Sequence, residues 1–213
     1  MQVRVKVCGV TLADDAASVA ASGVDFIGLN FWPKSKRYLA PERAPMIAAI
    51  ARAAGTAKLV GVFVDPTVDE VLAMVGRVDL DIIQLHGDET PDLCAKIAAA
   101  VYRPVWKAIA VGSPQSIERL DAWPVDAILL DAPTPTRGGA GATFDHGLAR
   151  MARERLPAQK IVLAGGLRAD TVAEAIATVQ PWAVDVASGV EAAPGVKDRA
   201  KLAAFVAAAR GAS

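Results

Sequence analysis

Two short segments of this chain end in side chains that could move protons. The apolar segment at residues 127–130 is too short for a helix, which predicts a buried strand, and it stops at Asp131. The alternating segment at residues 3–8 ends at Cys8. A carboxyl group and a thiol can serve as a general acid and a general base, and α/β proteins place such groups at strand ends. Each also has a plainer interpretation, because Asp131 could begin a solvated turn and Cys8 could be an inert buried thiol.

Polar residues occur at the same position in other predicted strands. By the two-residue period of a strand they share a face with Cys8, and we expect them to line the inner, upper rim of a barrel: Lys6, Asn30, Asp65, Gln84, His86, Lys107, Asp131 and Asp185. A buried charge without a partner costs several kcal/mol. We therefore expect Lys6 to pair with Asp131 or Asp185. For Lys107 and Gln84 we prefer a role as satisfied polar groups of the core.

Small residues end the last two predicted strands. Gly165-Gly166 and Ser188-Gly189 each follow an apolar segment and precede a helix. Such pairs often only make turns, but exposed backbone N–H groups at two neighbouring strand ends favour a phosphate site. The substrate is then a small phosphorylated molecule. Because the chain has only two histidines and no HxH or HExxH spacing, we predict neither a metal nor a cofactor.

The elements that must position these residues alternate regularly along the chain. Strands are predicted at residues 3–8, 25–31, 58–64, 81–85, 104–109, 127–130, 160–164 and 182–187. Helices are predicted at residues 11–21, 41–54, 68–75, after 91, at 115–122, up to 155, at 170–178 and at 196–210. Thr11 is the expected cap of the first helix. A proline and glycine loop follows Asp131, and Thr143 or Asp145 is expected to cap the next helix.

Eight strand–helix units predict the α/β class, with a parallel eight-stranded core closed as a (β/α)8 TIM barrel in one domain, residues 1–213. The rival architecture, a doubly wound open sheet, usually has a GxGxxG turn after its first strand, and VCGVTLADD is not that motif.

Composition excludes several classes of partner. Lysine plus arginine and aspartate plus glutamate are equal at 23 each, so no net charge favours nucleic acid. No apolar run reaches the roughly 20 residues of a membrane span, and the amino end does not resemble a signal peptide. With Cys8 and Cys94 the only cysteines, a reducing compartment is expected. These features predict a soluble cytoplasmic protein, as a monomer or homodimer, without nucleic-acid or membrane partners.

Six blocks of the chain resemble, in order, the signature segments of the phosphoribosylanthranilate isomerase family. They are residues 6–11 (KVCGVT), 31–38 (FWPKSKRY), 84–89 (QLHGDE), 129–131 (LLD) with the glycine loop, 163–167 (LAGGL) and 184–191 (VDVASGVE), the last followed by PGVKD at 194–198. Three residues depart from the family pattern. Ala142 stands where the family usually has lysine, Asn30 where it has an apolar residue, and Ala187 where it has serine.

The resemblance implies an Amadori rearrangement in tryptophan biosynthesis, in which N-(5-phosphoribosyl)anthranilate becomes 1-(2-carboxyphenylamino)-1-deoxyribulose 5-phosphate. It assigns Asp131 as the general acid that opens the furanose ring and Cys8 as the base that removes the C2′ proton. The acid would need a raised pKa, and the base a lowered pKa, to which Lys6 could contribute. Arg37 would hold the anthranilate carboxylate with two parallel hydrogen bonds, and His86 and Asp185 would face the sugar or support the catalytic groups.

Two alternatives remain open on the sequence. One is another phosphosugar isomerase or lyase on the same barrel, such as indole-3-glycerol-phosphate synthase or the histidine-pathway isomerase. The first would need a rim rich in lysine and glutamate, and the second would end its first strand with Asp in place of Cys8. The other alternative is a barrel that binds a phosphorylated ligand without turnover.

Overall fold

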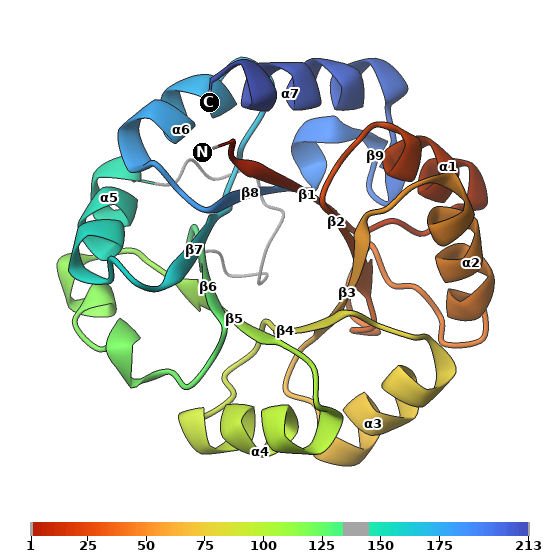
Figure 1. Cartoon of the computed structure of the whole chain (residues 1–213), viewed down its shortest axis with the longest axis horizontal. Helices are drawn as coiled ribbons and strands as arrows, with labels where there is room; N and C mark the ends of the chain where they lie inside the picture. The colour runs from red at the N-terminus through yellow and green to blue at the C-terminus, as the bar shows by residue number, and fades with distance from the viewer. Residues whose placement is uncertain (1, 134–144, 213) are drawn as a thin grey trace.

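Eight parallel strands close into a barrel in the computed structural model, which describes residues 2–133 and 145–212 (Figure 1). The strands are β1 (Arg4–Cys8), β2 (Phe26–Asn30), β3 (Lys58–Phe63), β4 (Ile82–Leu85), β5 (Val105–Ala110), β6 (Ala127–Asp131), β7 (Lys160–Leu163) and β8 (Ala183–Val186). Each pairs with the next along the chain, and β8 closes the ring on β1. The predicted (β/α)8 architecture is confirmed.

Helices surround the ring of strands on its outside (Figure 1). They are α1 (Ala13–Ala21), α2 (Ala44–Ala54), α3 (Val68–Arg77), α4 (Pro91–Val101), α5 (His146–Arg155), α6 (Val172–Val179) and α7 (Arg199–Gly211). None of the described helices has the length and apolar character that a membrane span needs.

Helix caps follow the sequence in most places. Asp145 caps α5 by accepting a hydrogen bond from the N–H of Gly147 (2.8 Å), as predicted, whereas Thr143 lies outside the described residues. The predicted cap at Thr11 is wrong. The first helix begins after Leu12, and the Thr11 hydroxyl instead donates to the carbonyl oxygen of Gly195 (2.7 Å).

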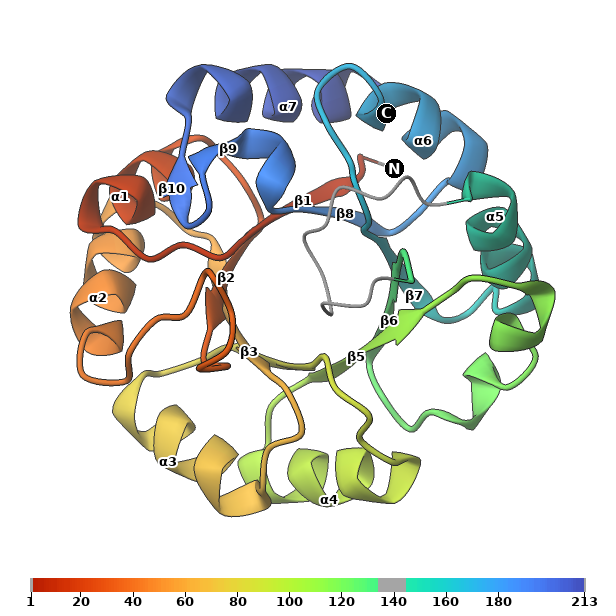
Figure 2. The same cartoon turned by 180° about the vertical axis from the view of Figure 1, so that it is seen from behind.

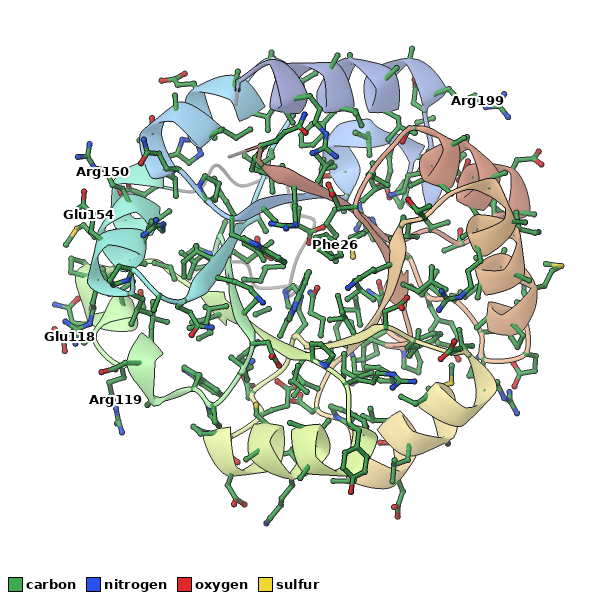
Figure 3. All side chains as sticks on the ribbon, in the orientation of Figure 1. Phe26, Glu118, Arg119, Arg150, Glu154 and Arg199 are labelled. Carbon is green, nitrogen blue, oxygen red and sulfur yellow. The ribbon has the colours of Figure 1, made fainter. Side chains whose placement is uncertain are left out.

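The strands separate two apolar cores, because successive side chains of a strand point to opposite faces. Along β6, Ile128 and Leu130 pack outward against the helices, while Ala127 and Leu129 fill the barrel interior. The lower interior is aromatic, and Figure 3 shows Phe26 inside the ring of strands. This aromatic layer fills the lower barrel, and side chains at the carboxyl ends of the strands can line a pocket above it.

Two segments differ from their predicted structure. Residues 115–122 form two 3₁₀ turns, η1 (Pro114–Ile117) and η2 (Leu120–Ala122), in place of an α-helix. Each turn buries one apolar side chain, Ile117 in η1 and Leu120 in η2.

The predicted helix at residues 196–210 begins only at Arg199, because Asp198 caps it. The residues before it form a hairpin of β9 (Glu191–Ala193) and β10 (Val196–Lys197) after the turn η3 (Ser188–Val190). Gly195 has φ +80° at the hairpin turn, a conformation that glycine adopts without strain. Figures 1 and 2 place this hairpin between α1 and α7, beside the carboxyl end of β1.

Candidate active site

A pocket at the carboxyl ends of the strands brings most of the predicted site residues together. It encloses about 730 Å³, including space open to solvent. Eight of the nine predicted site residues line it: Cys8, Arg37, His86, Asp131, Gly165, Gly166, Asp185 and Ser188. Gly189 lines an adjoining pocket, which it shares with Gly166 and Ser188.

Lys6 and Asp185 form a buried ion pair below the pocket. The two residues are direct partners across the β1–β8 pairing, so their side chains point into the barrel at the same level. The Lys6 ammonium lies 3.0 Å from both carboxylate oxygens of Asp185. Burial alone would lower the pKa of Lys6, but the charges of Asp185 and Cys8 raise it above the ordinary value. Of the two partners predicted for Lys6, the structure therefore selects Asp185.

Cys8 is partly buried at the end of β1. It pairs with Gly28 of β2, and a methyl group at Gly28 would lie 2.7 Å from the Cys8 sulfur, so glycine provides the space for the thiol. Burial raises the pKa of Cys8 above the ordinary value of a thiol, although the charges of Lys6 and Lys197 act in the opposite direction. The lowered pKa expected for a thiol base is thus wrong for the unliganded protein, because desolvation outweighs the nearby cations.

Asp131 lies at the end of β6 in contact with His86. The His86 Nε2 is 3.4 Å from one carboxylate oxygen, and the N–H of Ala132 donates to the other (2.8 Å). Gly165, with φ +86°, lies close to the oxygen that accepts from Ala132, since an added methyl group there would lie 3.2 Å from it. The N–H of Ala132 thus faces the Asp131 carboxylate as a hydrogen-bond donor.

Gln84 fixes the orientation of the His86 ring from within the barrel. Its side chain is fully buried, and its Nε2 lies 3.0 Å from Nδ1 of His86. If the amide nitrogen donates, Nδ1 accepts and the proton of a neutral imidazole lies on Nε2, which faces Asp131. Among residues 2–133 and 145–212, no group donates to the Gln84 Oε1.

Lys107 is a buried polar group of the core with its own partners, as predicted. Its ammonium lies 3.0 Å from Glu89 and donates to the carbonyl oxygens of Gly87 and Ala108, each at 2.8 Å. Asp65, in contrast, was wrongly placed on the inner rim. It is exposed, has φ +49°, and accepts a hydrogen bond from the N–H of Asp88 (2.5 Å).

The predicted phosphate-binding residues present backbone donors at the ends of β7 and β8. Gly165 and Gly166 both have positive φ, at +86° and +67°, which turns the chain sharply after β7. Within the described part of the chain, the N–H of Gly166 donates to no protein acceptor, and Gly189 lies in the turn η3 after β8. A side chain at Gly189 would collide with the carbonyl oxygen of Leu167, so the two strand ends pack closely. An anion could bind there through backbone N–H groups alone.

Asn30 organises the loop that carries Arg37. Its Oδ1 accepts from the N–H of Trp32 (2.9 Å), and its Nδ2 donates to the Ser35 hydroxyl (3.2 Å). The Ser35 hydroxyl in turn accepts from the N–H of Arg37 (3.1 Å). The polar residue that departs from the family pattern thus has a structural role in this loop.

The Arg37 guanidinium is already paired on one edge. Its Nε and Nη2 donate to the two carboxylate oxygens of Glu191 at 2.8 and 2.6 Å. The expectation that Arg37 presents two parallel donors to a substrate carboxylate therefore applies only to its other edge, Nη1 with the second hydrogen of Nη2. Glu191 and its second partner, Lys197, were not predicted from the sequence, although both lie in the segments that carry the family resemblance.

No group of three or more His, Cys, Asp and Glu side chains in the described ranges is arranged to hold a metal ion. These residues offer a carboxyl group and a thiol that could each exchange a proton with a bound molecule, beside hydrogen-bond donors for two anions.

Comparison with known proteins identifies the family of this chain. The family model of N-(5'phosphoribosyl)anthranilate (PRA) isomerase matches residues 5–208. The chain is 43% identical over 215 residues to the N-(5'-phosphoribosyl)anthranilate isomerase of Myxococcus xanthus, covering 99% of this chain and 97% of that protein. It is also 43% identical over 209 residues to the enzyme of the same name from Thermotoga maritima, covering 98% and 99% of the two chains.

Solved structures give the same result. The crystal structure of phosphoribosyl anthranilate isomerase from Thermotoga maritima superposes with a TM-score of 0.90 at 43% identity, covering 99% of this chain and all (100%) of that chain. A phosphoribosyl anthranilate isomerase in complex with reduced 1-(o-carboxyphenylamino)-1-deoxyribulose 5-phosphate superposes with a TM-score of 0.86 at 40% identity, with 99% and 100% coverage.

Proposed function

We propose that this chain, which belongs to the N-(5'-phosphoribosyl)anthranilate isomerase family, converts N-(5-phosphoribosyl)anthranilate into 1-(2-carboxyphenylamino)-1-deoxyribulose 5-phosphate in tryptophan biosynthesis. The observation that carries the proposal is that Cys8 and Asp131 line one pocket from different strands, β1 and β6. Two proton-transfer groups can then reach one sugar from different sides. The relative that binds a reduced form of the product supports the identity of the ligand.

Asp131 acts first in the proposed mechanism. In its protonated form it donates to the furanose ring oxygen, the bond between C1′ and that oxygen breaks, and a protonated Schiff base forms. The Ala132 N–H stabilises the resulting carboxylate, and His86 faces its second oxygen. His86 is thus a supporting group for the acid.

Cys8 acts in the second step. Its thiolate removes the proton from C2′, and the electron pair moves toward the iminium nitrogen to give an enolamine, which tautomerises to the product ketone. Because burial raises the pKa of Cys8, only part of the thiol is ionised in the free protein, so the cationic Schiff base must favour the thiolate within the complex. The substrate itself then supplies the positive charge that the thiolate needs.

Substrate binding divides between the two ends of the pocket. The phosphate binds the backbone N–H groups at Gly165, Gly166, Ser188 and Gly189, and the anthranilate carboxylate binds the free edge of Arg37. This orientation puts the ribose between the two anion sites, within the pocket that Cys8 and Asp131 line. Asp185 lines the same pocket but is committed to Lys6.

Turnover of N-(5-phosphoribosyl)anthranilate by the purified protein tests the proposal. We expect the fluorescence of the anthranilate substrate to decay at a rate proportional to enzyme concentration, and the product to be consumed by added indole-3-glycerol-phosphate synthase. Binding of substrate without decay would indicate a barrel without turnover. Neither binding nor decay would indicate another phosphosugar substrate. A relative from Thermotoga maritima has been described as dimeric, so sedimentation of the active protein would test a homodimer.

A further inference from the structure

The Arg37 side chain is held from one side by a buried acidic residue. Glu191 is 6% exposed and accepts from both Nε and Nη2 of Arg37. Arginine has five N–H donors in a rigid plane, so two bonds along one edge fix the direction of the other edge. Three donors remain, on Nη1 and Nη2, and none of them donates to another described residue. Arg37 itself lines the pocket that contains Cys8.

Glu191 is in turn fixed by the β9–β10 hairpin. The Lys197 ammonium lies 2.8 Å from the Glu191 Oε1, and the N–H of Gly195 donates to the same oxygen (3.2 Å). The Lys197 side chain is fully buried, and its ammonium also donates to the carbonyl oxygen of Cys8 (2.6 Å). The hairpin therefore connects the Arg37 guanidinium to the strand end that carries the thiol.

The charges of this cluster favour an anion in the pocket. With Arg37 and Lys197 protonated and Glu191 ionised, the three carry one net positive charge. Burial lowers the pKa of Lys197, and the charge of Glu191, 2.8 Å away, opposes that shift. Burial would raise the pKa of Glu191, but the hydrogen bond from Arg37 and the charge of Lys197 lower it below the ordinary value, which keeps the carboxylate ionised. Glu191 therefore remains paired with Arg37 near neutral pH.

We propose that Glu191 and Lys197 are positioning residues that direct the free edge of Arg37 toward the substrate carboxylate and hold it at a fixed place relative to Cys8. The inference rests on the proposed function, because it assumes that Arg37 binds the anthranilate carboxylate. Glu191 and Lys197 touch no substrate atom in this account. Their effect is specific to ligands that carry the carboxylate, and a general structural role would not give that specificity.

The affinities of two ligands, measured by calorimetry, distinguish a positioning role from a general structural role. One ligand is reduced 1-(o-carboxyphenylamino)-1-deoxyribulose 5-phosphate, and the other is its phenylamino analogue without the carboxylate. We expect Glu191→Gln to weaken binding of the first by about tenfold or more, and binding of the second by less than about twofold. Lys197→Met should likewise weaken binding of the first ligand more than binding of the second. Equal losses for both ligands would overturn the proposal, and so would tighter binding of the first ligand, because Glu191 would then compete with the substrate.

Arg37→Ala and the double variant Arg37→Ala/Glu191→Gln complete the experiment. If Glu191 acts through Arg37, Glu191→Gln has no further effect on the preference for the carboxylate once Arg37 is absent. A preference that survives Arg37→Ala would contradict the proposed carboxylate site itself. A preference lost in Arg37→Ala but kept in Glu191→Gln would overturn only the positioning role.

Two further variants control for folding. Asp25→Asn removes a carboxylate that accepts from the N–H of Val5 (2.8 Å) and pairs with Arg210 (2.7 Å), remote from the pocket. It should lower stability without changing the ratio of the two affinities. If Glu191→Gln does not fold, Glu191→Asp keeps the charge but is one methylene shorter, and it should reduce the same preference to a smaller extent. An unchanged preference in a folded Glu191→Asp protein would count against the proposal.

Discussion

Replacing Asp185 with asparagine should destabilise the protein strongly, because it removes one partner of a buried ion pair. Lys6 is fully buried and 3.0 Å from both Asp185 oxygens. Asparagine keeps the shape but not the charge, so the Lys6 ammonium would remain buried without a counterion. Breaking a buried pair on one side costs about 3–5 kcal/mol of unfolding free energy.

The pH dependence of this loss provides a second signature. In the parent protein the pKa of Lys6 is raised, so the stability due to the pair is present below the pKa of an unfolded lysine and is lost only as the pH rises through the folded value. In Asp185→Asn, burial is the main remaining influence and lowers the pKa of Lys6. The unfolded chain then binds more protons than the folded protein, so stability should rise with pH until the pH reaches the pKa of an unfolded lysine.

Urea denaturation followed by circular dichroism measures both effects. The double variant Lys6→Met/Asp185→Asn should recover at least about half of the loss, because neither position of the pair then carries a buried charge. Asp170→Asn is the matched control, since its pair with Arg168 is about two-thirds exposed (66% and 65%) and should contribute less than about 1 kcal/mol. A loss below about 1 kcal/mol in Asp185→Asn, or a double variant no more stable than the single one, would refute the reasoning.

Three other predictions concern the pocket. In a Cys94→Ser background, alkylation of Cys8 by iodoacetamide should accelerate by about tenfold per pH unit up to at least about pH 9, because the pKa of Cys8 is raised. A rate that levels off near neutral pH would show a lowered pKa. Gly189→Ala should lower the free energy of unfolding by about 1–3 kcal/mol and raise the Kd for inorganic phosphate, because the added methyl group collides with the Leu167 carbonyl oxygen. Unchanged phosphate binding in calorimetry would place the anion site elsewhere. Arg37→Lys should raise KM nearly as much as Arg37→Ala, since an ammonium group cannot both pair with Glu191 and present a second edge to the substrate. A KM for Arg37→Lys equal to that of the parent protein in steady-state kinetics would contradict this.

The sequence predicted the barrel because the pattern of each unit is local. Alternation in residues 3–8 and the short apolar run at 127–130 define strands that the structure places at Arg4–Cys8 and Ala127–Asp131. The two-residue period then places Cys8 and Asp131 on the inner face, where both line the pocket. Strand pattern and side-chain direction were therefore sufficient to bring the two proposed catalytic groups together.

What the sequence did not predict depends on contacts between distant segments. Glu191 and Arg37 are 154 residues apart, and no local pattern shows that one carboxylate will occupy the edge of that guanidinium. The hairpin that holds Glu191 is too short to have a strand pattern of its own. The raised pKa of Cys8 has the same origin, because desolvation depends on the whole pocket and not on the neighbouring Lys6 alone. The predicted loop residues Gly138, Gly139, Gly141 and Ala142 lie outside the described part of the chain.

The turnover rate of Cys8→Ser tests the central claim most directly. Serine keeps the size of cysteine but is a far weaker base near neutral pH, so the variant should fold, bind the reduced product analogue with nearly the parent affinity, and lose about 10²–10⁴-fold in kcat. Asp131→Asn should lose a similar factor, and the double variant should lose less than the product of the two, because blocking either step already stops the reaction. A folded Cys8→Ser protein that isomerises N-(5-phosphoribosyl)anthranilate at nearly the parent rate would contradict the assignment of Cys8 as the base.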